Sequence, residues 1–434
     1  MVDAVLPDIN IGSPRNPIDS SPHVNDPKNL VSAEVSLGGT IPTDTTIKEV
    51  IIGESLLNPS AHVAVTLQSA IYAMNPKESR YFNTWQVKDW NQYRCQPIDL
   101  YIHDNNPNNP RTMRVSQQIY RMDNRHASTI NTGQVEEFTL HAIDNSILKD
   151  AQVVWEKSWS CATPSQIVRE ALQKIGATSS FVEQAGPARP YAAESIHPLQ
   201  VIQQQANVAL DGDDPSFLHY MTINDTTGQN QHHFTPLSRL GKTTPWTIYA
   251  SDTEVSGLKS FSDSYSDYSV AVNFNFPCDF DILTDILNGI DCNGKNLNQT
   301  RTFNMVSGVF DAAGVIGQGL DIANKLISMT NLGTAQQQGA GGSGCETKVE
   351  KYLHKRQARM ALLDRDKIAL RITIPWTPRL HVGNKINFIW NNRYDQSQKV
   401  YGSGEYIIAH LTHNIQFGGY AVTNLDCITN TFGA

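Results

Sequence analysis

Residues 367–374 read KIALRITI, and this stretch shows most clearly the pattern that decides the fold. Large apolar residues occupy every second position from Ile368 to Ile374, and Lys, Arg and Thr fill positions on the opposite side. Successive side chains of a β-strand point to opposite faces, so the alternation predicts a strand with one buried face. The C-terminal part of the chain is therefore predicted to be built on sheet.

The same alternation continues to the C-terminus. It recurs in KINFIW (385–390) and in SGEYIIAHLTHNIQ (403–416), and a Gly pair then leads into YAVTNLDCIT (420–429), which predicts a β-hairpin. These segments predict a small antiparallel barrel. Its structural turns are predicted at Pro375, Gly383, Gly404, Gly418 and Gly419.

A comparable block lies near the N-terminus, after an arm at residues 1–29 that is rich in Pro, Asn, Asp and Ser. Many short alternating segments without a long helix between them predict a first tube-like barrel over residues 30–150. The alternating sets are Val31/Ala33/Val35/Leu37, Val63/Val65/Leu67, Ile98/Leu100/Ile102, Met113/Val115 and Phe138/Leu140/Ala142.

Helical spacing appears between the two β-rich blocks. Thr163, Pro164 and Gln166 match a capping box, and the following apolar face ends at Gly176, which predicts a helix over this stretch. A second helix is predicted from Pro198, followed by a hairpin with strands at 217–223 and around His233. Residues 151–245 are thus expected to form a small α/β domain.

The second barrel is expected to comprise residues 246–290 plus 351–434, separated by an insertion at 291–350. Within the insertion, apolar residues at helical spacing predict a helix over 305–327, and the Gly- and Gln-rich stretch 331–344 has the composition of a flexible linker. The predicted fold class is α+β and mainly β: two small antiparallel tube-forming barrels joined by a small α/β domain and assembling as a ring.

Composition limits the function. The 434 residues include 34 Lys and Arg against 42 Asp and Glu, a formal charge of −8, which argues against a general nucleic-acid binder. No apolar run is long enough to span a membrane, and the acidic N-terminus lacks a secretory signal, so folding in a cytoplasm is expected. The six scattered cysteines, without a CxxC pair, are interpreted as reduced thiols.

Titratable residues offer candidate sites, each with a simpler explanation. His410 and His413 are three apart on a predicted strand and should face opposite ways, so a shared metal is not expected. His232 and His233 flank a hairpin turn and are interpreted as solvated. The acidic groups Asp211/Asp213/Asp214 and Asp279/Asp281/Asp285 could supply paired carboxylates for acid–base chemistry, but the first is better explained as a loop.

Motifs of known enzymes are missing from the sequence. GVIGQG (314–319) lacks both the order of a dinucleotide-binding fingerprint and the Gly-Lys-Ser/Thr ending of a phosphate loop, and no GxSxG, HExxH or CxxC occurs. The sequence therefore favours a structural or interaction protein over an enzyme, with no catalytic, cofactor-binding or metal residue and no cofactor. A muralytic role stays open.

The order of these blocks resembles the central baseplate hub proteins of contractile-tail phages and the hub part of type VI secretion spike proteins. The segments with this likeness are TPSQIVREALQKIG (163–176), ESIHPLQVIQQQANVAL (194–210), FLHYMTIND (217–225) and the C-terminal stretch from RITIPWTPRL (371–380) to LDCIT (425–429). The likeness spans most of residues 30–430. The N-terminal arm and the insertion depart from it.

The resemblance implies a non-enzymatic homotrimer in which each chain supplies two barrels. Such a trimer would link a hexameric tail tube to a trimeric central spike in the virion baseplate, after assembly in the host cytoplasm, and leave a channel for DNA. Implied partners are the tube, spike and baseplate wedge proteins. The apolar face of the helix at 305–327 could pack against a neighbouring chain or the end of a tape-measure protein, and packing on its own barrel is the alternative. The alternatives are a hub with peptidoglycan hydrolase activity and the equivalent hub of a cellular contractile injection system.

Overall fold

The chain is mainly β with few helices, as the alternation predicts. The computed structural model describes residues 31–39, 45–70, 95–104, 111–130, 133–212, 214–240, 242–250, 268–277, 301–304, 309–312, 345, 368–392, 398–417 and 420–429. No helix within these residues is both long and apolar enough to cross a membrane.

Six antiparallel strands form the first curled sheet, in the order β1-β4-β5-β6-β3-β2. The strands are β1 (Val31–Leu37), β2 (Thr45–Ser55), β3 (His62–Ala70), β4 (Pro97–Asp104), β5 (Thr112–Ile130) and β6 (Gly133–Ile143). The predicted inward sets of β3 and β4, Val63/Val65/Leu67 and Ile98/Leu100/Ile102, are fully or almost fully buried. The alternation therefore identified the buried face of this sheet correctly.

The second curled sheet closes on itself. It contains β12 (Trp246–Tyr249), β13 (Tyr268–Val270), β14 (Asn273–Asn275), β17 (Leu370–Pro375), β18 (Lys385–Ile389), β19 (Gly404–Gln416) and β20 (Ala421–Ile428). Strand β13 pairs with β12 and the adjoining β14 pairs with β17, so residues 268–275 bridge the two edges. Strand β12 is parallel to both β13 and β18, which differs from the wholly antiparallel barrel that the sequence predicts.

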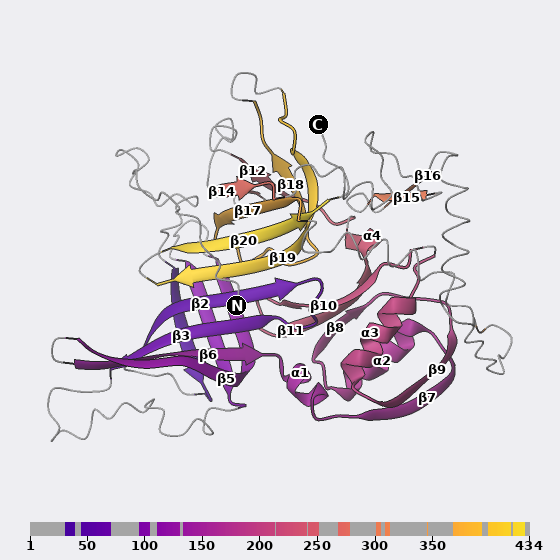
Figure 1. The fold of residues 1–434 in the computed structure, drawn as a ribbon, viewed down its shortest axis with the longest axis horizontal. Coiled ribbons are helices and arrows are strands. Elements are labelled where there is room, and N and C mark those ends of the chain that lie inside the picture. The colour runs from indigo at the N-terminus through magenta and orange to yellow at the C-terminus, as the bar shows by residue number, and fades with distance from the viewer. Residues whose placement is uncertain are drawn as a thin grey trace.

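One ladder fuses the two curled sheets into a single sheet of thirteen strands among the described residues. Strand β2 pairs with β19 in antiparallel register, from Ser55 opposite His410 to Glu49 opposite Gln416. In Figure 1 the yellow strands β19 and β20 lie directly above the indigo strand β2. The two β-rich blocks are thus joined by backbone hydrogen bonds.

The two long helices α2 and α3 lie to one side of the fused sheet, and strands β8, β10 and β11 lie between them and the sheet (Figure 1). This part consists of α1 (Asn145–Asp150), β7 (Trp155–Ala162), α2 (Pro164–Lys174), β8 (Ser179–Val182), β9 (Arg189–Ile196), α3 (Pro198–Val208), β10 (Phe217–Ile223), β11 (Asn230–Pro236) and α4 (Leu237–Leu240). The sequence predicted both long helices and the β10–β11 hairpin, but not the β7–β9 pair.

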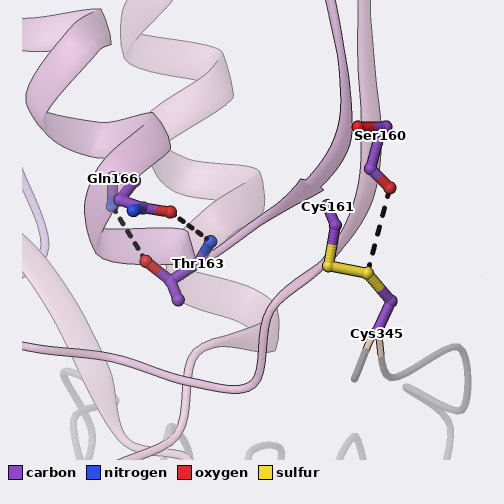
Figure 2. The surroundings of a disulfide bond; sticks show 5 residues. All are labelled: Ser160, Cys161, Thr163, Gln166 and Cys345. Atoms are coloured by element: carbon purple, nitrogen blue, oxygen red, sulfur yellow. Dashed lines mark hydrogen bonds between the residues drawn. A yellow bond between two sulfur atoms is a disulfide. The ribbon is translucent and has the colours of Figure 1, made fainter. Parts of the chain in front are cut away.

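Helix α2 begins and ends as its sequence predicts. The Thr163 hydroxyl accepts from the Gln166 N–H, and the Gln166 side-chain oxygen accepts from the Thr163 N–H, which completes the capping box in Figure 2. At the other end Gly176 has φ +68° and the Ala177 N–H donates to the Leu172 carbonyl, which is the Schellman arrangement.

The insertion differs from its prediction where the structure describes it. Residues Arg301–Asn304 (β15) and Val309–Ala312 (β16) form a two-stranded antiparallel pair, so a helix over 305–327 is wrong at 309–312. Strand pairing with β15 outweighs the helical spacing there. The rest of that range, the 331–344 linker and the arm at 1–29 lie outside the described residues.

A disulfide joins Cys161, near the end of β7, to Cys345 (Figure 2). The interpretation of all six cysteines as reduced thiols is wrong for this pair. The two residues are 184 positions apart in sequence, so no local spacing could reveal them, yet their Cα atoms lie 5.9 Å apart. Cys95 and Cys427 are free, and Cys278 and Cys292 lie outside the described residues.

We expect Cys161→Ser to lower the free energy of unfolding by up to about 5 kcal/mol, because the disulfide closes a very long loop of the unfolded chain. Urea unfolding of both proteins without reductant measures this difference. Cys95→Ser, at an exposed free thiol, is the control and should change stability by less than about 0.5 kcal/mol. Equal stability of wild type and Cys161→Ser would contradict the disulfide.

Candidate functional site: a three-way junction around one buried hairpin

Strand β10 belongs to three hydrophobic cores at once. Each of its seven residues is at most 7% exposed, so both faces of the strand are buried. Ile223 packs in the core of the first sheet, Leu218 and Tyr220 pack in the core of the second, and Phe217 packs with the helices. The β10–β11 hairpin is therefore the element through which the three parts of the chain contact one another.

A buried carboxylate, Glu54, joins three segments at this junction. Its position in β2 places it on the inward face, and its side chain has no exposed surface. Glu54 Oε1 accepts the Ile223 N–H of β10 at 2.8 Å and lies 3.1 Å from His381 Nδ1, while Oε2 accepts the Val382 N–H at 3.2 Å. One side chain thus ties the first sheet to the hairpin and to the turn before β18.

Glu54 and His381 form an ion pair. Burial raises the pKa of Glu54, but the charge and hydrogen bond of His381, the Ile223 amide and the nearby His413 outweigh burial and hold the pKa below its ordinary value. Burial lowers the pKa of His381, but the charge and hydrogen bond of Glu54 outweigh it and raise the pKa. Both pKa shifts favour the charged pair, in which Glu54 is a carboxylate and His381 is an imidazolium.

A second polar chain links the hairpin to the first sheet. His219 Nε2 lies 3.0 Å from His232 Nδ1, and His232 Nε2 lies 3.0 Å from Ser146 Oγ in α1. Asn230 donates to Asp144 at 2.8 Å and accepts from Gln117 of β5 at 3.0 Å. These hydrogen bonds connect the hairpin to β5 and to α1 across the boundary.

The loop of the hairpin, residues 224–229, lies on the edge of β5. Arg114 and Ser116 of β5 donate their N–H groups to the carbonyls of Asp225 and Gly228, each at 2.8 Å. Gly228 has φ +74°, and a Cβ there would lie 3.1 Å from the Ser116 nitrogen. Glycine therefore allows the close approach by which the loop covers this edge.

Arg111 makes a separate direct link between the two sheets. It lies between β4 and β5, where its backbone N–H donates to Asp104 at 2.8 Å. Its guanidinium donates to the Trp376 carbonyl at 2.6 Å, at the Pro-rich corner after β17. The Trp376 side chain, which follows a strand of the second sheet, is buried in the core of the first sheet. The two sheets are therefore linked here by both a hydrogen bond and an apolar contact.

The predicted turn residues lie in different places relative to this junction. Gly383 lies at its centre, with φ +83° and Tyr220 Oη only 2.9 Å from the position of a Cβ. Pro375 ends β17 opposite Val422, and Gly404 begins β19 opposite Phe388. Gly418 and Gly419 lie outside the described residues.

The histidine predictions have mixed outcomes. His413 is buried beside Thr423 while His410 lies on the other face of β19, so the predicted divergence is confirmed. His232 is only 1% exposed, so its interpretation as solvated is wrong. Its neighbour His233 is half-buried on the opposite face, hydrogen-bonded to Thr222 at 2.9 Å. Sequence could not show that α1 covers this face of the hairpin.

The acidic groups do not meet in a common site where the structure describes them. Asp211 forms an ion pair with Arg239 at 3.2 Å, and Asp214 is buried and accepts the Ser216 N–H. Asp213, the group at 279–285 and the GVIGQG stretch lie outside the described residues. Within the described part, no three His, Cys, Asp or Glu side chains gather closely enough to hold a metal ion.

Sequence reasoning missed Glu54, the residue with the most connections at the junction. A signal was present in the sequence. Every second residue from Val50 to Leu56 lies on one face of the strand, and all of these residues are apolar except Glu54. A carboxylate in register with core residues indicates a buried, paired group. Its partners lie about 170 and 330 residues away, so only the fold identifies them.

A comparison with solved structures finds matches at low sequence identity and with TM-scores below 0.5. The 43 kDa tail protein of prophage MuSo2 from Shewanella oneidensis is 10% identical, with a TM-score of 0.49 over 92% of this chain and 98% of that chain. The tail protein from Neisseria meningitidis MC58 is 10% identical, with a TM-score of 0.47 over 92% of this chain and 96% of that one.

The c3393 protein of Escherichia coli, a component of the type VI secretion system, is 11% identical, with a TM-score of 0.46 over 92% of this chain and 78% of that one. No protein-family model and no curated protein sequence matches the chain.

We expect Glu54→Gln to lower the free energy of unfolding by about 2 to 3 kcal/mol near pH 5.5, because a buried ion pair loses one partner. Folding lowers the pKa of Glu54, so its contribution is present above about pH 4.5 and is lost as the pH falls. Folding raises the pKa of His381, so its contribution is present below about pH 6.5 and is lost as the pH rises.

The difference between wild type and Glu54→Gln should therefore be largest between about pH 4.5 and 6.5. Urea unfolding at pH 5.5 and 8.5 measures it. The matched control is Glu49→Gln on the same strand, where the carboxylate has only a 3.4 Å contact with Gln416. A difference that does not depend on pH would contradict the ion pair.

We also expect Gly383→Ala to lower the free energy of unfolding by about 2 kcal/mol, because the position combines a positive φ with too little space. The double variant Gly383→Ala/Tyr220→Phe removes the crowding hydroxyl and should recover part of the loss. Gly53→Ala on β2, where nothing lies within 4 Å of the new methyl group, is the matched control. Thermal unfolding compares the four proteins, and equal effects at positions 383 and 53 would refute the close contact.

Proposed function

We propose that this chain is the non-enzymatic central hub of a contractile phage-tail baseplate. Three copies form a ring that links a hexameric tail tube to a trimeric central spike and leaves an axial channel for DNA. In this proposal the blocks at 30–150 and at 246–290 plus 351–434 are the two similar ring units, and residues 151–245 join them.

The observation on which the proposal rests is the rigid connection between the two sheets. The β2–β19 ladder continues one sheet into the other, and the β10–β11 hairpin places side chains in all three cores. An adaptor between two assemblies must hold its attachment units in a fixed orientation, whereas many enzymes use hinges to open and close a cleft. The junction fixes that orientation through buried contacts.

The way the second sheet closes also suits a structural element. Residues 268–275 pair with β12 on one side and with β17 on the other, where the Val272 N–H donates to the Thr373 carbonyl at 2.7 Å. A closed sheet has no free edge for unwanted pairing and distributes tension over many hydrogen bonds. This property supports a role in which the chain transmits force.

The identity of the assembly comes from the sequence. The segments 163–176, 194–210 and 217–225 resemble the corresponding part of phage baseplate hubs, and the last of them is the strand that the three cores share. The formal charge of −8 is compatible with a channel that DNA must leave, because acidic walls do not retain phosphates. The partners in this proposal are tube, spike and wedge proteins of the virion.

The purified chain should form a trimer of three 48.1 kDa subunits, about 144 kDa, alone or, with the mass of the spike in addition, once its spike partner is added. Light scattering coupled to gel filtration measures the mass, and negative-stain electron microscopy should show a ring with threefold symmetry. A strict monomer under both conditions, with no ring in the images, would refute the proposal.

A further inference from the structure

The β10–β11 hairpin contains three histidines, which is an unusual concentration of titratable groups for a buried element. His219 is 4% exposed and His232 is 1% exposed, and their rings stack at 5.3 Å with planes 9° apart. His233 points to the opposite face and stacks on Tyr220 at 4.8 Å. Both faces of the hairpin therefore carry a group that can gain a proton in mildly acidic solution.

The spacing of the His219 and His232 rings leaves room for only one proton between their facing nitrogens. Nε2 of His219 and Nδ1 of His232 are 3.0 Å apart, a distance at which one N–H lies between the two nitrogens. The other nitrogen of His232 is bound to Ser146 Oγ. If both rings were protonated, two N–H groups would face each other inside the core, and the contact would break.

Compensating charges near the hairpin are already engaged. The Asp144 carboxylate acts electrostatically on His232, and its two oxygens already accept from the Ser146 N–H and the Asn230 side chain. The Glu54 carboxylate acts in the same way on His233, and it is paired with His381. A proton on either histidine would therefore create a buried charge whose counter-charge already has partners.

Other titratable groups around the hairpin act in both directions: burial lowers the pKa of His413, which favours release in acid, whereas the Glu54 charge raises the pKa of His381, which favours docking in acid. His413 of β19 and His381 lie close enough to Glu54 and His233 to add positive charge when protonated. Asp225, in the loop of the hairpin, acts on His381, and burial keeps the Tyr220 hydroxyl neutral. The groups facing the hairpin thus supply cations as readily as anions when the pH falls.

We propose that the β10–β11 hairpin is an acid-sensitive joint: proton uptake by its buried histidines releases the hairpin from the two sheets while the sheets remain folded. This inference goes beyond the proposed hub function and does not depend on it. Release would loosen the connection between the two ring units without cutting the chain, so the joint would respond to an acidic environment.

The direction of the effect follows from burial. Burial lowers the pKa of His232 and of His233 from 6.5 to about 4, and it lowers the pKa of His219 well below its ordinary value. Between about pH 4 and pH 6.5 the released hairpin therefore binds more protons than the docked hairpin. Docking is stable above about pH 6.5 and is lost as the pH falls. Between pH 7.5 and 5.0, each such histidine raises the opening equilibrium about 30-fold.

Hydrogen exchange read by mass spectrometry on the full chain tests this joint. Labelling at pH 7.5 and 5.0, corrected for intrinsic exchange rates, should show at least a 30-fold loss of protection in β10 and β11 at the lower pH. Strands β3 and β18, whose inward residues are apolar, should keep their protection. Loss of protection in all four strands together, or no loss in the hairpin, would overturn the inference.

The variant His232→Gln keeps a hydrogen-bonding side chain but cannot take up the proton. When the pH falls from 7.5 to 5.0, the protection factor of the hairpin should decrease by a factor about 30 times smaller in this variant than in the wild type. The control His103→Gln changes a half-buried histidine on β4 that contacts Ser32 of β1, and it should behave like wild type. An unchanged acid response in His232→Gln and His233→Gln would overturn the inference. If a variant does not fold, the wild-type comparison still decides the question.

Discussion

The burial of strand β10 on both faces is the constraint on which the rest of the structure depends. A strand with no solvent-exposed face must find apolar partners on two sides and hydrogen-bond partners for every polar side chain. In this chain β11 supplies His232 and His233 as partners for the side chains of His219 and Thr222. The first sheet supplies Glu54, which accepts the Ile223 N–H and also bonds His381 of the second sheet, and Ser146 of the helical part bonds His232. None of the three parts can shift relative to the others without leaving a buried polar group unpaired.

Local patterns predicted the elements of this fold well. The alternation of Ile98, Leu100 and Ile102 identified both a strand and its buried face, because period-two alternation is a property of the strand itself. The capping box at Thr163 and the Gly176 ending fixed helix α2 because all of those contacts lie within one or two turns. The junction was visible only in part, through the prediction of the β10–β11 hairpin and of Gly383.

What the sequence could not reveal depends on contacts between distant residues. Glu54 finds its partners hundreds of positions away, His232 is buried because α1 covers it, and Cys161 meets a cysteine of the insertion. At residues 309–312, pairing with β15 overrides helical spacing, and β12 joins its neighbours in parallel although nothing in its four residues indicates direction. In each case the deciding energy comes from a partner that sequence spacing does not identify.

The β2–β19 ladder has a consequence for biosynthesis. Glu49 and Gln416 of this ladder are 367 residues apart, so β2 leaves the ribosome long before its partner is translated. At about 5 to 20 residues per second, the edge of β2 waits roughly 20 to 70 s. During that interval the nascent chain presents an unpaired strand that can join a neighbouring chain on the same polysome. A chaperone that shields this edge during translation would therefore raise the yield of correctly folded protein.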